Sequence, residues 1–410
     1  MPAFIPSYQT LGLGSGWNCR RAAPLPYPLG HDRVRKYYLG RNAVFHGARA
    51  LGLGEGDEIL FPAYHSGTES APLFHLGCRL SYYGVRRDLT IDLDEIEAKI
   101  TPATRAIYAI HFFGFPAPMA ALRAMADRHG LPLIEDAALS FLAQCDGRQA
   151  GAWGDVSIFC LYKSLPVAAG GVLAINRPDI SLPPEPREST FYSELNLTAK
   201  HVLNHFELHG GLPGKLLRRC AQRVLGRAVS AARLKVTSPD ALAFDPGLLD
   251  RRMGWLTRCI VGSLDFARVI ERRRANYAWM AAALQGTQVK LLRDDLPTGA
   301  VPLFLPILVD DKFGAVARLH EEGIDAIPVW GIHHPYLPRG EFRDVEFLVD
   351  RAVEIPIHQS LELRHLLRIR DALLRHAAWP EYAPNEPGPW QGDAPAEPAL
   401  AVSLSTDAGR

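Results

Sequence analysis

The stretch LPLIEDAAL, residues 131–139, is an apolar run that ends on two adjacent acids, Glu135 and Asp136. Short runs that are almost wholly apolar are typical of strands buried on both faces of a parallel sheet. A carboxylate at the carboxyl end of such a strand lies at the edge where open α/β sheets bind ligands. The stretch therefore predicts a central strand with an acid at the ligand-binding edge.

The flanking segments alternate between helical and strand patterns from about residue 40 to 178. Helical spacing is found at 41–53, 70–77, 91–100 and 119–130, and strand patterns at 58–64, 79–85, 105–114, 156–163 and 170–176. Strands separated by helices are joined by right-handed crossovers, so the loops that follow the strands gather along one edge. Three loops there are candidate site segments: PAYHSGTES (62–70), EDAAL (135–139) and KSLP (163–166).

Size and composition exclude several classes of protein. The chain has 410 residues, 22% of them charged, and a formal net charge of +1, which gives no general attraction to nucleic acid or acidic lipid. No nucleic-acid-binding motif is found. The six cysteines form no C-x-x-C pair, so we expect no metal site and a reduced, cytoplasmic protein. We expect neither a signal peptide nor a membrane span.

The texture changes along the chain suggest four parts. We expect an N-terminal arm over 1–34, a large α/β domain over 35–240, a small α+β domain over 241–378 and a disordered tail over 379–410. The large domain contains a helical, basic insertion at 183–237. This insertion either packs over the site or a dimer mate, or lies on an acidic lipid surface.

The segment FCLYKSLPVAAGG, residues 159–171, places Lys163 directly after a strand pattern. An amine near the carboxylate of Asp136, together with a glycine-containing helix start at LGRNAVF (39–45), is the set of groups that pyridoxal 5′-phosphate (PLP) needs. The lysine forms a Schiff base, the acid keeps the pyridine nitrogen protonated, and helix N–H groups hold the phosphate. An exposed lysine at a strand end is the alternative.

Several segments together resemble the DegT/DnrJ/StrS family of PLP-dependent, sugar aminotransferase-like enzymes. They are residues 51–64, 93–138 and 151–176, and the resemblance resumes at LLDRRMGWLTRCIVGSLD (248–265) and EIPIHQSL (354–361). It implies a fold-type-I α/β structure with a mainly parallel seven-stranded sheet and a smaller C-terminal α+β domain. It also implies a homodimer that moves an amino group from an amino acid, with glutamate as the expected donor, to a keto substrate such as a nucleotide-linked keto-sugar.

By this resemblance Lys163 is the Schiff-base lysine, which also carries the substrate proton, and Asp136 is the ionised partner of the pyridine nitrogen. Ten residues are implied for cofactor binding: Gly40, Arg41, Asn42, His65, Ser66, Asp136, Leu139, Cys160, Lys163 and Arg252. The backbone N–H groups of 40–42 would face the phosphate. Arg41 would add a bidentate contact, unless it pairs with a surface acid. Arg252 would reach the phosphate of the partner subunit.

Three of these positions depart from the family pattern. Cys160 replaces a phosphate-binding serine, and a thiol is a weak donor. Leu139 replaces a Gln or His near the ring. Ser66 replaces a ring-stacking aromatic residue, for which Tyr64 or His65 could substitute.

Histidines supply the remaining candidates. GIHHPYLPRGEF (331–342) would face the cofactor from the small domain, which makes His333, His334 and Arg339 candidate substrate contacts, unless the segment is a plain loop. His111 is either a core residue or a site residue. His201, His205 and His209 share one helical face, but no further ligand completes a metal site.

Two other functions stay open. The departures at Leu139 and Cys160 and the insertion are compatible with a PLP-dependent elimination, dehydration or condensation. A non-catalytic regulatory relative is the third possibility, although the presence of both Asp136 and Lys163 argues against it.

Overall fold

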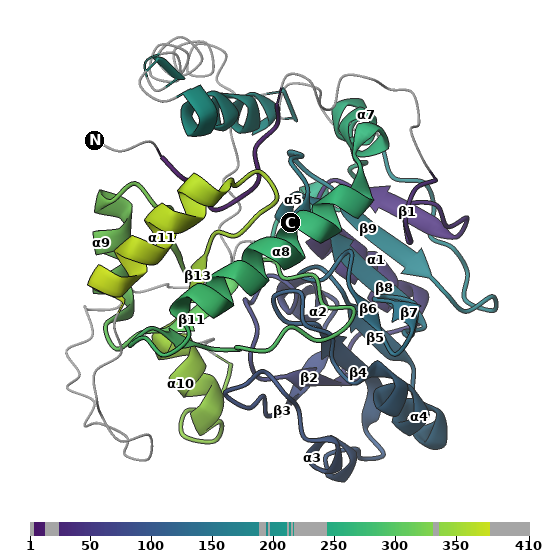
Figure 1. Cartoon of the computed structure of the whole chain (residues 1–410). Helices are drawn as coiled ribbons and strands as arrows, with labels where there is room; N and C mark the ends of the chain where they lie inside the picture. The colour runs from purple at the N-terminus through teal and green to yellow at the C-terminus, as the bar shows by residue number, and fades with distance from the viewer. Residues whose placement is uncertain are drawn as a thin grey trace, which may run out of the picture. The chain divides into compact units, whose positions relative to one another are not determined.

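The computed structural model describes residues 4–12, 24–187, 194–195, 197–210, 213–214, 216, 244–330 and 336–377. Its main feature is a seven-stranded sheet in the order β1-β9-β8-β5-β4-β2-β3 (Figure 1). The strands are β1 (Val34–Tyr37), β2 (Glu58–Pro62), β3 (Arg79–Tyr83), β4 (Thr104–Ile110), β5 (Leu133–Asp136), β8 (Val156–Cys160) and β9 (Gly171–Ile175). A small hairpin, β6 (Gln144–Cys145) with β7 (Arg148–Gln149), lies outside this sheet.

The sheet is mainly parallel, as the sequence predicts. The pairs β2·β3, β2·β4, β4·β5 and β5·β8 are parallel, and only β8·β9 and β1·β9 are antiparallel. The helices between the strands are α1 (Gly40–Ala50), α2 (Ala71–His75), α3 (Leu93–Ala98) and α4 (Met119–His129). Asp92 caps α3, and Gly130, in the left-handed region at φ 63°, ends α4.

Both faces of the sheet are buried, which explains its nearly continuous apolar strands. On one face Ile107 and Leu133 pack with α4 residues such as Leu122 and Met125. On the other face Tyr108 and Ile134 belong to a core shared with α1 and the C-terminal elements. Alternate residues of one strand therefore serve different layers.

The predicted strand over 156–163 is wrong in its last three residues. Strand β8 stops at Cys160, and a short helix, α5 (Leu161–Ser164), carries the lysine. Pairing with β9 ends at Cys160↔Gly171, and the Leu165 N–H bonds to the Leu161 carbonyl at 2.8 Å. The apolar run continues through this turn because it stays buried, so hydrophobicity alone did not mark the boundary.

The C-terminal part is built on a four-stranded antiparallel sheet in the order β10-β11-β13-β12. Its strands are β10 (Lys290–Leu291), β11 (Leu305–Leu308), β12 (Ile327–Pro328) and β13 (Ala352–Ile355). Its helices are α7 (Trp255–Ser263), α8 (Phe266–Leu284), α9 (Lys312–Glu321), α10 (Arg343–Arg351) and α11 (Leu363–His376), after a 3-10 turn at Pro246–Leu248. Helices α7 and α8 are separate, because the Asp265 side chain caps the start of α8.

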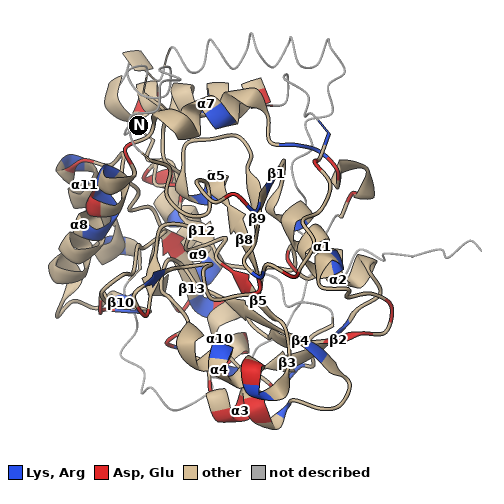
Figure 2. Ribbon diagram, turned by 90° about the vertical axis from the view of Figure 1, so that its right-hand side faces the viewer, with Lys and Arg blue, Asp and Glu red and all other residues tan. Residues whose placement is uncertain are grey.

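The described part of the N-terminal arm, 4–12, contacts both the C-terminal part and the helix that follows β8. Ile5 pairs with Ile324 of the C-terminal part, and the Gln9 side chain donates to the Tyr162 carbonyl at 3.1 Å. The predicted tail (379–410) and most of the predicted insertion (183–237) lie outside the described residues. Basic and acidic residues are both spread over the described elements (Figure 2). None of the helices described is long and apolar enough to cross a bilayer.

Candidate active site

A pocket lies at the carboxyl ends of the central strands, where the topology of the sheet predicts a ligand site. It gathers residues from the start of α1, the loop after β2, the ends of β4, β5 and β8, and helix α5, with one residue from the C-terminal part. The lining residues are Leu39, Gly40, Arg41, Val44, Ser66, Thr68, Glu69, Ile110, Asp136, Ala138, Leu139, Ile158, Cys160, Tyr162, Lys163 and Trp330.

Asp136 ends β5 with its carboxylate buried in this pocket. One oxygen accepts a hydrogen bond of 2.6 Å from the Tyr108 hydroxyl, and the other accepts one of 2.8 Å from the Ala138 N–H. Burial, and then the negative charge of Glu69, raise the pKa of Asp136 above its ordinary value. A cation placed against this carboxylate would counter both effects.

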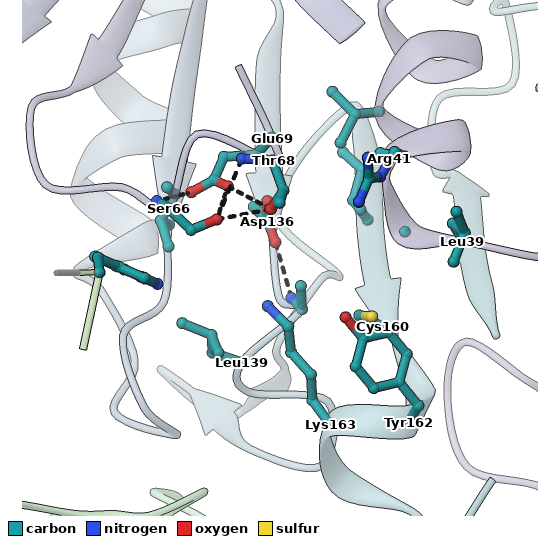
Figure 3. Close-up of a pocket in the computed structure, with 16 residues that line it drawn as sticks. Leu39, Arg41, Ser66, Thr68, Glu69, Asp136, Leu139, Cys160, Tyr162 and Lys163 are labelled. Atoms are coloured by element: carbon teal, nitrogen blue, oxygen red, sulfur yellow. Dashed lines mark hydrogen bonds between the residues drawn. The ribbon is translucent and has the colours of Figure 1, made fainter. Parts of the chain in front are cut away.

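Lys163 extends from α5 toward the same space as Asp136 (Figure 3). Its helix is held by two side chains from other parts of the fold. The Arg273 guanidinium, fully buried, donates to the Ser164 carbonyl at 3.2 Å and to the Gln9 side chain at 2.9 Å. Gln9 in turn donates to the Tyr162 carbonyl. The lysine is thus mounted on a braced turn rather than on a free loop.

The N-terminus of α1 forms the opposite side of the pocket, with Arg41, Cys160 and Tyr162 nearby (Figure 3). The N-cap Leu39 offers no side-chain acceptor and the first turn holds no acid, so the positive end of the helix dipole faces the pocket. Gly171 permits this arrangement. A Cβ there would stand 2.0 Å from the Leu39 carbonyl oxygen, so only glycine lets β9 approach the helix start.

Cys160 occupies the end of β8 within this basic side of the pocket. Its side chain is buried, and burial raises the pKa of the thiol. It is therefore a neutral, weakly donating group at the position where the resemblance implies a hydroxyl.

Seven of the ten residues predicted for cofactor binding line this pocket: Gly40, Arg41, Ser66, Asp136, Leu139, Cys160 and Lys163. The other three do not. The Asn42 side chain donates to the Leu248 and Leu249 carbonyls at 2.6 and 3.1 Å. His65 accepts from the Gly67 N–H at 3.1 Å and stacks on Tyr82, and Arg252 pairs through its backbone with Tyr37.

The predicted substrate contacts are not brought to this pocket by the described structure. Arg339 lies exposed in a turn, and it is not a lining residue. His333 and His334 lie outside the described residues.

Nine lining residues were not predicted individually: Leu39, Val44, Thr68, Glu69, Ile110, Ala138, Ile158, Tyr162 and Trp330. Thr68 and Glu69 lie within the candidate site segment 62–70 but were given no role. Trp330 adopts φ 37°, unusual for a residue other than glycine, and packs against Tyr64 with ring centroids 4.4 Å apart. Tyr64, suggested as a substitute ring, is buried behind it and does not line the pocket. Trp330 follows a two-residue strand, where no pattern in the sequence marks it.

The remaining histidines have structural partners. His111 is fully buried, and its Nε2 lies 2.8 Å from Glu135 Oε1 while its Nδ1 accepts from the Ala117 N–H. It is a core residue. His201, His205 and His209 each contact a different group: the Gln9 carbonyl, the Thr10 hydroxyl and the Glu362 carboxylate.

One protein family matches residues 40–182, the segment that holds every pocket residue except Leu39 and Trp330. The family is the DegT/DnrJ/EryC1/StrS aminotransferases. The resemblance that the sequence indicates is thereby confirmed. A curated relative is the UDP-N-acetyl-3-dehydro-alpha-D-glucosamine 3-aminotransferase of Acidithiobacillus ferrooxidans. It is 35% identical over 133 residues, which are 32% of this chain and 36% of that protein.

Solved structures share the fold over most of the chain. DesV of S. venezuelae, solved in complex with a ketimine intermediate, gives a TM-score of 0.61 at 23% identity and covers 83% of this chain and 84% of that one. NtdA of Bacillus subtilis, solved with bound cofactor PMP, gives 0.56 at 21% identity and covers 83% and 72%. The expected α/β fold with a mainly parallel seven-stranded sheet is therefore confirmed. The chain spans little more than a third of the curated relatives it matches, 36% and 38%.

Proposed function

We propose that the protein is a PLP-dependent aminotransferase that moves an amino group from an amino acid to a keto substrate. The observation that carries the proposal is the shared pocket of Lys163 and Asp136, which come from helix α5 and strand β5 and face one small space. The family match to residues 40–182 supports the same activity, and NtdA shares this fold and is described with the related cofactor PMP.

The residues present fit the cofactor. PLP is anionic at its phosphate and cationic at a protonated ring nitrogen, and the charges of the pocket are complementary to these. The positive end of α1, with Arg41, forms one side, and the buried acid Asp136 forms the other. The amine of Lys163 reaches between them (Figure 3). We assign the phosphate to Gly40 and Arg41 and the ring nitrogen to Asp136.

When bound, PLP supplies an aldehyde that accepts the amino group and a ring that withdraws electrons from the reacting carbon. Asp136 holds the ring-nitrogen proton, with its orientation fixed by Tyr108 and the Ala138 N–H. Lys163 binds the cofactor and, once its amine is released, moves the proton at the reacting carbon. Leu139 and Trp330 are apolar walls that exclude water from this space.

The substrate class is also a proposal. The relative in Acidithiobacillus ferrooxidans is named for a UDP-linked keto-sugar, and we assign a nucleotide-linked keto-sugar or a related small keto compound to this pocket. We propose glutamate as amino donor, a cytoplasmic location and a homodimer, in which Arg252 would serve the partner subunit's site. Arg252 lies outside its own chain's pocket, as such a role requires.

The test is a half-reaction. Protein loaded with PLP is mixed with L-glutamate, and the absorbance of the cofactor and the release of 2-oxoglutarate are followed together. The proposal predicts one equivalent of 2-oxoglutarate per site and loss of the cofactor's visible band. No product with glutamate or any other common amino acid would contradict it and favour an elimination or condensation in the same pocket.

A further inference from the structure

The pocket contains a second carboxylate that the proposed mechanism does not use. Glu69 lies in the loop after β2, one residue before the cap of α2, and only 9% of it is exposed. Figure 3 shows it on the same side of the pocket as Asp136, with the Lys163 side chain extending toward both. An acid this buried needs a reason, because burying a carboxylate is costly unless it is hydrogen-bonded or paired.

The loop fixes the position of the Glu69 carboxylate. Oε1 accepts from the Ser66 N–H at 2.8 Å, and Oε2 accepts from the Thr68 hydroxyl at 3.0 Å and from the Ser66 hydroxyl. These bonds come from residues three positions and one position earlier in the same short loop. The side chain cannot swing into solvent without breaking all of them, so its charge is held at the pocket wall.

This charge is present at neutral pH. Burial would raise the pKa of Glu69, but His65, the Ser66 hydrogen bonds and Lys163 together hold it below its ordinary value. The same charge acts on Asp136, whose pKa it raises. Two acids, Glu69 and Asp136, thus line one pocket, and each disfavours the ionisation of the other. The titratable groups that act on one or both from neighbouring elements are His65, Tyr108, Cys160 and Lys163.

We propose that Glu69 is a positioning residue of the cofactor site: its carboxylate keeps a proton between Asp136 and the ring nitrogen up to a higher pH than Asp136 alone would. The inference rests on the proposed function. The argument is electrostatic, since a fixed negative charge beside the pair favours the protonated form wherever the proton resides. Glu69 has no part in bond making. Its effect is to extend cofactor binding, and the ring's electron withdrawal, into the alkaline range.

The experiment measures binding rather than turnover. The dissociation constant of pyridoxine 5′-phosphate, which has the ring and phosphate but no aldehyde, is determined from pH 6 to 9.5 for the full-length wild type and Glu69→Gln. Affinity should fall on the alkaline side for both proteins. For Glu69→Gln the fall should begin about one pH unit earlier, with binding about tenfold weaker at the pH where the curves differ most.

Two controls separate charge from structure. Glu55→Gln removes an equal charge from an exposed position of the preceding loop and should leave the curve in place. A deaza analogue, in which carbon replaces the ring nitrogen, should bind wild type and Glu69→Gln with the same pH dependence. If Glu69→Gln does not fold, Glu69→Asp takes its place. This variant withdraws the carboxylate by one methylene. The pH at which affinity begins to fall should shift in the same direction as for Glu69→Gln, but by less.

Each outcome has a defined meaning. Superimposable curves for wild type and Glu69→Gln would overturn the inference. So would an equal loss of affinity at every pH, shared by the deaza analogue, because that is the effect of a disturbed loop. If wild type binds neither pyridoxine 5′-phosphate nor PLP, the proposed function fails and this inference with it.

Discussion

Glu135 and Asp136 are consecutive carboxyls on β5, and they face opposite sides of the sheet. Glu135 accepts hydrogen bonds of 2.6, 2.8 and 2.7 Å from the N–H groups of Gly151, Trp153 and Gly154, and it contacts His111. Although burial would raise its pKa, these partners hold the pKa of Glu135 below its ordinary value. Asp136 has two donors and an acidic neighbour, and its pKa is raised.

The difference shows how one strand can carry both a structural and a reactive acid. Both carboxylate oxygens of Glu135 are occupied by hydrogen bonds within the protein. Its charge therefore stabilises the turn at 151–154 and does not bind a ligand. The surroundings of Asp136 do not fully stabilise its negative charge, so a bound cation would stabilise it. A buried acid whose surroundings do not stabilise its charge marks a ligand site better than an acid that is merely buried.

The largest expected effect comes from the pocket side of β5. Asp136→Asn keeps the shape but cannot carry the negative charge that holds a ring proton. We expect amino transfer to fall by about 10³-fold, in the range found when a preorganised electrostatic group is removed. The measurement is the rate of 2-oxoglutarate release from glutamate in single turnovers. Retention of more than a tenth of the rate would show that Asp136 does not have this role.

The next effect comes from the other side of the strand. Glu135→Ala leaves three backbone donors and His111 without their acceptor, so we expect the free energy of unfolding to fall by about 3–5 kcal/mol. Urea denaturation of the protein without added cofactor measures it, with Glu135→Gln as a milder control that retains one acceptor oxygen. A loss below about 1 kcal/mol would contradict the structural role of Glu135.

The pH dependence of stability should have opposite signs at the two positions. The pKa of Glu135 is depressed in the fold, so its contribution is present above the unfolded value and is lost as pH falls through the folded value. The pKa of Asp136 is raised, so its contribution is present below the unfolded value and is lost as pH rises through the folded value.

At neutral pH, without added cofactor, Asp136→Asn should therefore be more stable than wild type, by about 1 kcal/mol, and Glu135→Gln less stable. Urea midpoints from pH 4 to 8 decide this. The difference in stability between variant and wild type should rise with pH for Asp136→Asn and fall with pH for Glu135→Gln. The same direction for both variants would contradict the contrast between the two faces.

The smallest expected effect is at Cys160, on the side of the pocket proposed for the phosphate. Cys160→Ser replaces a weak donor by a hydroxyl, and we expect PLP to bind about fivefold more tightly, the worth of one ordinary hydrogen bond. Equilibrium dialysis against PLP measures this. Unchanged or weaker binding would place the phosphate away from the end of β8.

Sequence alone predicted the central sheet, because buried parallel strands are almost wholly apolar. It predicted the pair Asp136 and Lys163 because residues at the carboxyl ends of such strands lie at the ligand-binding edge of the sheet. It placed Glu69 in a candidate site segment (62–70) but gave it no role, because an acid in the polar stretch HSGTES has the composition of a surface loop and only the hydrogen bonds of Ser66 and Thr68 hold it in the pocket. It missed Trp330 because a two-residue strand from a distant part of the chain brings it to the pocket. Hydrophobic pattern also could not show that Asn42 turns toward Leu248.

The central claim is that Lys163 and Asp136 form one site around one small ring. Protein mixed with PLP is reduced with borohydride, digested and mapped by mass spectrometry, for wild type and for Lys163→Arg as the matched variant that keeps the positive charge. The account predicts one labelled peptide, modified at Lys163, and no such label in Lys163→Arg. Label spread over exposed lysines in equal measure in both proteins, or none in wild type, would contradict it.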